Sequence, residues 1–213
     1  MLTEERKTIV KKSELYEYLA YCRSNIWPSI RTAGGQILCV VGGVIGKPKN
    51  HLVQMTSFSN FDDLKTSQGA WAMDRSEFIE LEKVSLLQPI SSRPKGVIPP
   101  EDRRPFYGLR KFYISSSNVK EFVECSEDGI WPRMENMGAS ILGMWTTLSS
   151  TSPTEITLLT GYNSPTHWEQ TRFDSLKSNE SQNQIWDREE ALRKRRDDIT
   201  INTWVDFMES VEF

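Results

Sequence analysis

This chain of 213 residues contains an internal repeat, and the repeat limits its fold more than any other feature. The stretch "NIWPSIRTAGGQIL", which begins at Asn25, returns in a closely similar form as "GIWPRMENMGASIL", which begins at Gly129. A shift of 104 residues, from Asn25 to Gly129, aligns the chain with itself without a gap over about 60 positions. Because a shared Ile-Trp-Pro tripeptide is rare by chance, we expect two copies of one structural unit.

Each copy predicts the same order of elements. A strand precedes an amphipathic helix with apolar residues at i, i+3, i+4 and i+7, and proline in the Trp-Pro pair marks the expected end of that helix. Gly34 and Gly138 mark the next turn, and two strand-like runs then predict a hairpin. The expected first strands of the two copies are 5–10 and 109–114. The charged helical segments are 74–83 and 186–198, and the last strands are 84–90 and 199–208.

The order β-α-β-β-α-β is that of the ferredoxin-like unit, an α+β fold. Its helices cover one face of a four-stranded antiparallel sheet, so the other face is apolar and needs a cover. We therefore predict that the two repeats pack their antiparallel sheets into an intramolecular α/β barrel with a central cavity. The expected domains are repeat 1 at 1–90, a Pro-rich linker at 91–106 and repeat 2 at 107–213.

Composition narrows the class of protein further. A formal net charge of −3 gives no electrostatic reason to expect nucleic acid or an anionic membrane as partner. No apolar run approaches the roughly 18–20 residues of a membrane span, and the N-terminus has no secretory pattern, so we expect a cytoplasmic protein. Three scattered cysteines fit a reducing compartment. Phosphate-loop, dinucleotide-binding, serine-hydrolase and zinc-protease motifs are absent from the sequence.

Three stretches of the second copy carry a family resemblance. "YGLRKFYI" opens with Tyr107 and places Arg110 in a strand, and "MGASILGMWTT" places Gly143 and Trp145 in another. "LLTGYNS", followed by "WEQTRFDSL", supplies a tyrosine-containing strand and an arginine-bearing helix. Together they resemble the NIPSNAP family of the dimeric α/β-barrel superfamily, and the first copy matches more loosely. The resemblance implies the barrel fold, in a superfamily that includes cofactor-free monooxygenases, isomerases and haem-dependent enzymes.

Arg6 and Arg110 are the first candidate catalytic residues. Strand residues at i and i+2 share a face, so Arg6 shares one with Glu4 and Thr8, and Arg110 shares one with Phe112. If that face lines the cavity, each arginine can hold a carboxylate or enolate oxygen, and Glu4, Thr8 and Phe112 contact the substrate. The alternative is a structural Glu4–Arg6 pair, or arginines that fix the closure of the barrel.

His51 and His167 are candidate general bases, and the alternative is that both are surface residues. Haem ligation by either histidine stays open, whereas the lack of clustered acids or cysteines predicts no metal site. Trp145 stands where the first copy has Val41, so it forms a pocket wall or packs in the core. The basic run 193–196 is flanked by acids at helical spacing and is typical of a solvated helix face.

The leading functional hypothesis is an enzyme that acts on a small, largely apolar organic molecule in the barrel cavity. Cofactor-free acid/base chemistry is expected, as isomerisation, cyclisation or oxygenation, with an arginine stabilising negative charge and a histidine as base. We expect no cofactor, metal, nucleic acid or membrane, and a homodimer is compatible with the sequence. The alternative is a non-catalytic module that binds a ligand or a protein. The positions where the copies differ, such as Glu4 and Gly108, are the expected places for chemistry.

Overall fold

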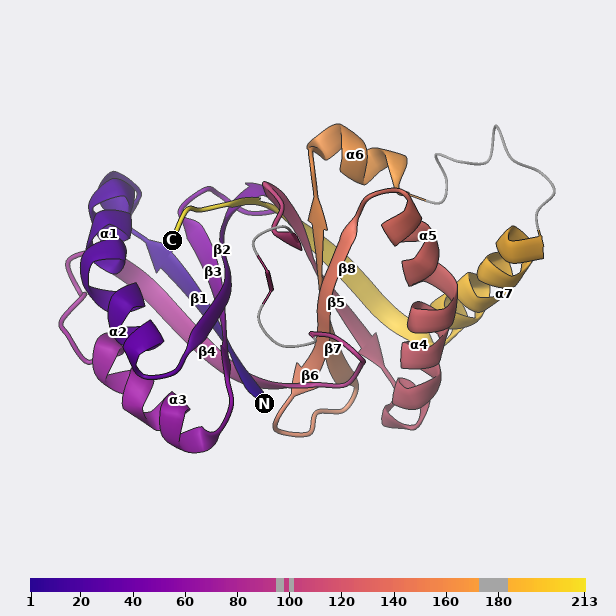
Figure 1. The fold of residues 1–213 in the computed structure, drawn as a ribbon, viewed down its shortest axis with the longest axis horizontal. Helices are drawn as coiled ribbons and strands as arrows, with labels where there is room; N and C mark the ends of the chain where they lie inside the picture. Colours follow the sequence, from indigo (N-terminus) through magenta and orange to yellow (C-terminus); the bar gives the residue numbers. More distant parts are fainter. Residues whose placement is uncertain (95–97, 100–101, 173–183) are drawn as a thin grey trace. The chain divides into compact units, whose positions relative to one another are not determined.

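The chain forms two compact units, and a computed structural model describes residues 1–94, 98–99, 102–172 and 184–213. The first unit comprises Met1–Pro89 and Asp206–Phe213, and the second comprises Ile90–Val205 (Figure 1). The division differs from the predicted one at the C-terminus. It does so because the last strand is long enough for its end to pair with a strand of the first unit.

The first unit has the predicted β-α-β-β-α-β order. Its elements are β1 (Leu2–Val10), α1 (Leu15–Tyr21), α2 (Trp27–Thr32), β2 (Gln36–Ile45), β3 (His51–Phe58), α3 (Phe61–Ser67) and β4 (Ile79–Pro89). β1 pairs with β3 and β4, and β3 pairs with β2, always antiparallel. The three helices lie on one side of this sheet (Figure 1).

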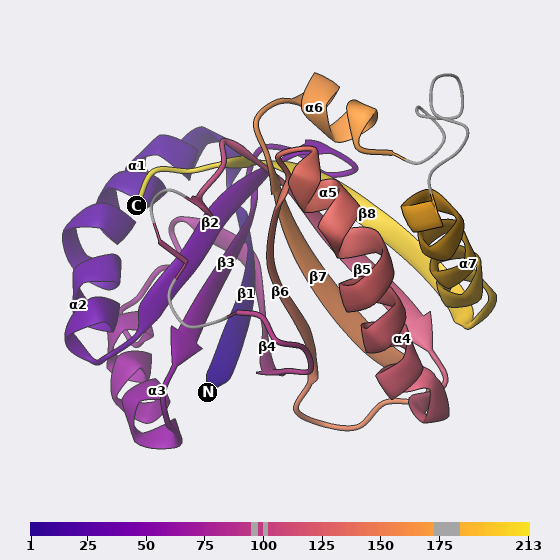
Figure 2. The same cartoon turned by 45° about the vertical axis from the view of Figure 1, so that its right-hand side comes forward.

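The second unit repeats this order. Its elements are β5 (Phe106–Ile114), α4 (Val119–Cys125), α5 (Trp131–Asn136), β6 (Ser140–Thr147), β7 (Thr154–Tyr162), α6 (Pro165–Gln170), α7 (Gln184–Asp198) and β8 (Thr200–Ser210). The segment α4–α5 and the helix α7 run along the same face of its sheet (Figure 2). Its register keeps the offset of the sequence repeat: Arg6 pairs with Gln54 in the first unit, and Arg110 with Leu158 in the second.

The predicted fold class is confirmed. Two ferredoxin-like repeats are present, and the hydrogen-bonded strand order β1-β3-β2-β8-β5-β7-β6-β4 closes on itself as a barrel. Each unit has its own apolar core between sheet and helices, which contains Trp27 in the first unit and Trp131 in the second. In the described ranges no helix has both the length and the apolar character needed to cross a membrane.

Two local predictions were wrong. The Trp-Pro pair does not end the first helix, because a π-helical turn, Cys22–Ile26 or Ser126–Ile130, leads into a further helical segment with proline in its first turn. The backbone stays helical through the residue before each Trp-Pro pair, so the proline lies inside a continuous helical run, directly after the π-helical turn. The segment 74–83 was predicted to be helical, yet β4 begins at Ile79. The alternation of Ile79 and Leu81 with acidic residues has the period of a strand.

Candidate functional site

Arg6 and Arg110 point to the sheet face that the helices of their own unit cover. Phe112 and Ile114, two and four residues after Arg110 on β5, belong to the apolar core beneath those helices. Val10, four residues after Arg6 on β1, belongs to the matching core of the first unit. The predicted sharing of a face by residues at i and i+2 is therefore observed. The candidate site must be sought between sheet and helices within one unit.

In the first unit, Arg6 is enclosed by acidic partners. Its Nε donates to Glu4 Oε1 at 3.0 Å, and its Nη1 donates to Glu82. Glu82 also accepts two hydrogen bonds from Arg75, at 2.7 and 3.0 Å, and one from Thr8 Oγ1 at 3.2 Å. Arg6 is only 4% exposed and Glu4 2%, so the alternative of a structural Glu4–Arg6 pair describes this geometry.

Aromatic and amide groups fill the rest of this first pocket. The guanidinium carbons of Arg6 and Arg75 lie 3.9 and 4.8 Å from the centroid of the Trp71 ring. Trp27 Nε1 donates to Gln54 Oε1 at 2.8 Å, so the buried indole N–H is satisfied within the protein. A residual space of about 10 Å³ remains, which is too small for an organic ligand.

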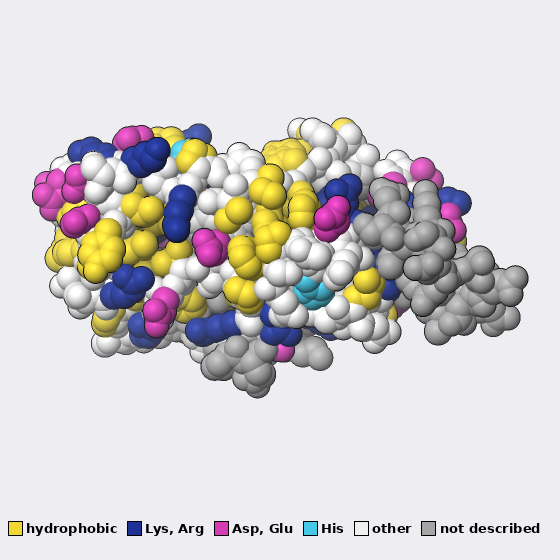
Figure 3. Space-filling model, turned by 90° about the horizontal axis from the view of Figure 1, so that it is seen from above, with side chains coloured by type: hydrophobic (Ala, Val, Ile, Leu, Met, Phe, Trp, Pro, Cys, Tyr) yellow, Lys and Arg dark blue, Asp and Glu magenta, His cyan; other side chains and the backbone are white. Residues whose placement is uncertain are grey.

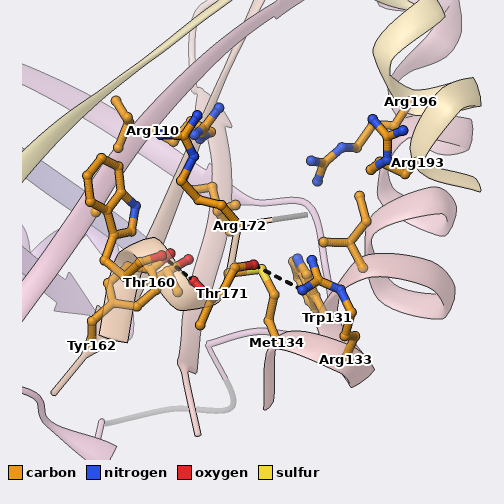
Figure 4. Close-up of a pocket in the computed structure, with 15 residues that line it drawn as sticks. Arg110, Trp131, Arg133, Met134, Thr160, Tyr162, Thr171, Arg172, Arg193 and Arg196 are labelled. Carbon is orange, nitrogen blue, oxygen red and sulfur yellow. Dashed lines mark hydrogen bonds between the residues drawn. The ribbon is translucent and has the colours of Figure 1, made fainter. Parts of the chain in front are cut away.

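In the second unit, the equivalent place is a cavity of about 180 Å³ (Figure 4). We call it the Arg110 pocket. Its lining comes from β5, β7, β8 and the helical layer: Gly108, Arg110, Ile130, Trp131, Arg133, Met134, Leu158, Thr160, Tyr162, Trp168, Thr171, Arg172, Arg193, Arg196 and Val205. Five of these side chains are arginines, and no carboxylate lines the cavity among the described residues.

Two of the five arginines are neutralised by a carboxylate. Arg133 donates to the buried Glu189, and Arg193 Nη1 lies 2.8 Å from Asp197 Oδ2. Arg110, Arg172 and Arg196 form no ion pair within 4 Å among the residues that the structure describes, and the charge of Asp197 acts on Arg110 and Arg196 only from farther away. In Figure 4, Arg110 and Arg172 lie side by side, and Arg196 approaches from α7 across the cavity. The pocket therefore concentrates positive charge beside an apolar wall that includes Trp131 and Leu158.

Burial away from any contacting carboxylate shifts the pKa values of these groups. Burial, assisted by the charge of Arg110 and opposed by that of Asp197, lowers the pKa of Arg196 to about 10. Burial also lowers the pKa of Arg110; Arg172 lowers it further, while Tyr162 opposes the shift. Burial raises the pKa of Tyr162 to about 12, so this phenol stays neutral near neutral pH. An anion in the pocket would relieve the cost of the buried cations.

The copies differ at the positions that set this charge. The offset of 104 residues places Gly108 at the position of Glu4, Arg172 at that of Gln68, and Leu158 at that of Gln54. In the first unit Gln68 Nε2 donates to Glu4 Oε2 at 3.0 Å. At two positions that are in contact in the first copy, the second copy therefore has glycine in place of an acid and a cation in place of an amide.

Sequence reasoning missed Arg172, Arg196 and Trp131 as site residues. The same tryptophan occurs in both copies, which favours a role for Trp131 in the shared scaffold over a role in one site. Arg196 lies in the run 193–196, which was read as a solvated helix face. The signal that could have found Trp131 is the difference between Gln54 and Leu158, which occupy equivalent positions in the two copies.

The other predicted site residues lie outside the Arg110 pocket. Glu4 and Thr8 belong to the Arg6 network, and His51 begins β3 with a half-buried side chain. The ring of Phe112 lies beneath the pocket, 5.8 and 5.2 Å from the guanidinium carbons of Arg110 and Arg196. Trp145 is fully buried in β6, where its ring packs over Gly143.

His167 joins two helices rather than facing the pocket. Its Nδ1 accepts from the backbone N–H of Asn163 at 3.0 Å, and its Nε2 donates to the Met137 carbonyl at 2.8 Å. This pair of partners requires the neutral tautomer with the proton on Nε2. Both ring nitrogens are therefore engaged with the backbone.

The charge of the pocket contrasts with the face shown in Figure 3. On this face the coloured Lys and Arg side chains are interspersed with acidic and apolar ones. Within the part of the chain that the structure describes, no three His, Cys, Asp or Glu side chains converge as metal ligands.

Comparisons with known proteins support the fold. No family model matches the chain, and no curated protein matches its sequence. A candidate monooxygenase from Fusobacterium nucleatum is similar in structure, with a TM-score of 0.64 and 11% identity, covering 99% of this chain and 92% of that one. An anthrone oxidase-like protein is similar with a TM-score of 0.62 and 11% identity, covering 99% of this chain and 91% of that one.

NIPSNAP proteins are also among the similar solved structures. One from Agrobacterium tumefaciens is 23% identical, with a TM-score of 0.35, and covers 41% of this chain and 91% of its own.

Proposed function

We propose that this chain is an enzyme that binds a small, largely apolar organic molecule in the Arg110 pocket and stabilises negative charge that develops on it. The observation that carries the proposal is the set of three guanidinium groups, Arg110, Arg172 and Arg196, without a described carboxylate partner. Guanidinium donors held in place in a partly buried pocket stabilise an enolate or phenolate oxygen more strongly than water does.

The lining sets limits on the chemistry. The described lining contains no histidine, and Tyr162, with its raised pKa, is a poor base at neutral pH. The substrate must therefore be acidic enough to ionise when nearby guanidinium groups lower its pKa. Aromatic ketones with an activated methylene group, and phenols, meet this condition. The cavity of about 180 Å³ is smaller than the roughly 300–1,000 Å³ of most ligand pockets, which favours a compact substrate.

Oxygenation is the reaction class that we favour, because two relatives similar over the whole chain bear the names monooxygenase and anthrone oxidase-like. In such a reaction an activated CH₂ group becomes a carbonyl group. One atom of O₂ enters the product, and the other leaves as water with the two hydrogens. The protein's part is to hold the ionised substrate and to spread its charge over the arginines.

Oxygen uptake tests the proposal. The purified protein is mixed with anthrone in buffer without added cofactor, and O₂ consumption and the absorbance of anthraquinone are followed. We expect turnover above the buffer rate, and Arg110→Gln should lower kcat/KM about 100-fold. Arg110→Lys keeps the charge but loses the planar pair of donors of the guanidinium, so its kcat/KM should lie between those of wild type and Arg110→Gln. Arg31→Gln, on α2 of the first unit, is the control and should leave the rate unchanged.

Two results would count against an enzyme. Turnover that Arg110→Gln leaves at the wild-type rate removes the role of the pocket. Saturable binding of aromatic probes without product favours the alternative, a non-catalytic ligand-binding module.

A further inference from the structure

The indole N–H of Trp131 lacks a partner that its counterpart has. Trp131 is 2% exposed and lines the Arg110 pocket, and its Nε1 is a buried donor without a hydrogen bond among the described residues. Its counterpart Trp27 is equally buried and donates to Gln54 Oε1 at 2.8 Å. Buried N–H groups are nearly always paired, so a missing acceptor in a cavity indicates a ligand atom.

The reason for the missing acceptor is one replacement. Leu158 occupies the strand position of Gln54, and it pairs with Arg110 across β5 and β7 as Gln54 pairs with Arg6 across β1 and β3. A leucine side chain cannot accept a hydrogen bond. The second copy therefore presents Trp131 Nε1 in the same cavity as the three arginines that lack a carboxylate partner.

A second buried donor lies in the same lining. Among the described residues, Arg196 Nε is buried without an acceptor, and the one hydrogen bond of its Nη1 is a long contact of 3.4 Å with Ser126 Oγ. Its guanidinium carbon lies 5.2 and 5.6 Å from the rings of Phe112 and Phe122. Contacts with aromatic faces leave the in-plane N–H groups of a guanidinium available to an oxygen acceptor.

We infer that the ligand of the Arg110 pocket carries a permanent carboxylate on an aromatic body, and that Trp131 Nε1 donates a hydrogen bond to this carboxylate. The inference deepens the proposed function, on which it rests for the choice of pocket, by naming an aromatic acid as the substrate class. A carboxylate has lone pairs for several donors. A ligand that carries a second acidic group can form ion pairs with more than one of the arginines. The aromatic body fits the apolar wall of Trp131, Met134 and Leu158.

Calorimetric titration of the full chain with four probes tests the class of ligand. The probes are phthalate, benzoate, benzamide and inorganic phosphate. We expect phthalate to bind most tightly, benzoate more weakly, and neutral benzamide at least about tenfold more weakly than benzoate, because a hydrogen bond to a charged group is the stronger one. Affinity for phthalate should fall as salt rises. Benzamide binding as tightly as benzoate overturns the inference, and so does phosphate binding more tightly than phthalate.

Two variants test the role of Trp131. Trp131→Phe keeps an aromatic ring but removes the donor, and should weaken phthalate binding about tenfold. Leu158→Gln restores the acceptor that the first copy has, so the protein itself satisfies Trp131 and phthalate binding should fall by a similar factor. Trp27→Phe in the first unit is the matched control and should leave phthalate affinity unchanged. Wild-type affinity in Trp131→Phe overturns the assignment, whether or not Leu158→Gln folds.

The two proposals can fail separately. Phthalate binding that depends on Trp131, without oxygen uptake on any probe, leaves the inference standing and removes the enzyme. Turnover of neutral anthrone at the same rate in wild type and Trp131→Phe, without selective binding of acids, keeps the enzyme and removes the inference.

Discussion

The two copies of one pocket differ in how they treat the same arginine. In the first unit, Arg6 is 4% exposed and lies among Glu4, Glu82 and the ring of Trp71, with almost no free space. In the second, Arg110 faces a cavity of about 180 Å³ and has no described carboxylate partner. A duplicated scaffold can thus keep one copy as a closed, neutral support while the other opens toward a ligand.

The largest expected contrast is in stability. Arg6→Gln should lower the free energy of unfolding by about 3–5 kcal/mol, because Glu4 and Glu82 lose their shared cation in a buried site. Arg110→Gln removes a cation that contacts no carboxylate among the described residues, so it should cost nothing or stabilise the protein. Urea unfolding followed by circular dichroism measures both. Equal losses in the two variants would mean that the pockets do not differ in charge balance.

Acid should act on the first pocket through Glu82. Burial by itself raises the pKa of this carboxyl, but the hydrogen bond from Arg75 and the charges of Arg6 and Arg75 outweigh burial and lower it below the ordinary 4.5. The stabilisation is thus present above the ordinary pKa and is lost as pH falls through the lowered one.

The matching variant is Glu82→Gln. It should cost about 2–4 kcal/mol at pH 7, and the gap to wild type should narrow below pH about 4. A gap that stays constant from pH 7 to pH 3 would show that the charge of Glu82 does not contribute.

An acid transplanted from the first copy should close the second pocket to anions. Gly108→Glu places a carboxylate at the position of Glu4, and should weaken phthalate binding about 30-fold by neutralising Arg110. The added Cβ would lie 3.2 Å from Tyr162 Cε2, a tight contact that any side chain there shares. Gly108→Gln is therefore the control for size, and an equal loss in both variants would assign the effect to shape instead of charge.

Alkaline pH should act on the second pocket through Arg196. Burial lowers the pKa of this guanidinium to about 10, below that of the unfolded chain, so holding the charge costs the folded state free energy at neutral pH. That cost is fully present below pH about 10 and disappears gradually as the pH rises from there toward the ordinary pKa of arginine.

Arg196→Met should therefore raise stability by about 1 kcal/mol at pH 8, which corresponds to a rise in Tm of about 2–4 °C. The advantage should shrink toward pH 11, and thermal unfolding across this range measures it. A variant less stable than wild type at pH 8 would mean that neighbouring groups such as Asp197 outweigh the cost of burying Arg196.

The smallest contrast concerns the paired tryptophans. Trp27→Phe removes the donor to Gln54 and should cost about 1 kcal/mol beyond the loss of packing area. Trp131→Phe removes a donor that has no partner, so only the packing loss remains. Urea unfolding of both variants measures this difference, and equal costs would imply an acceptor for Trp131 within the protein.

Much of the fold was predictable because two sequence repeats carry the same local patterns. The 104-residue offset, the strand periods and the turn glycines are local properties, and the structure repeats them element by element, with Gly34 and Gly138 at φ of 85° and 87°. The predictions failed where two local signals compete. The charged residues around the start of β4 are typical of a helix, and the Trp-Pro pair is typical of the end of a helix.

The sequence by itself determined the duplication and the α+β order of elements. It also determined that Arg6 shares a strand face with Glu4, and Arg110 with Phe112. Only the tertiary structure decided which face of the sheet these residues use and which charges are left without a partner. The physical reason is distance along the chain. Glu82 meets Arg6 from 76 residues away, and the arginines of α7 meet Arg110 across the core, so no local pattern records which charges are cancelled.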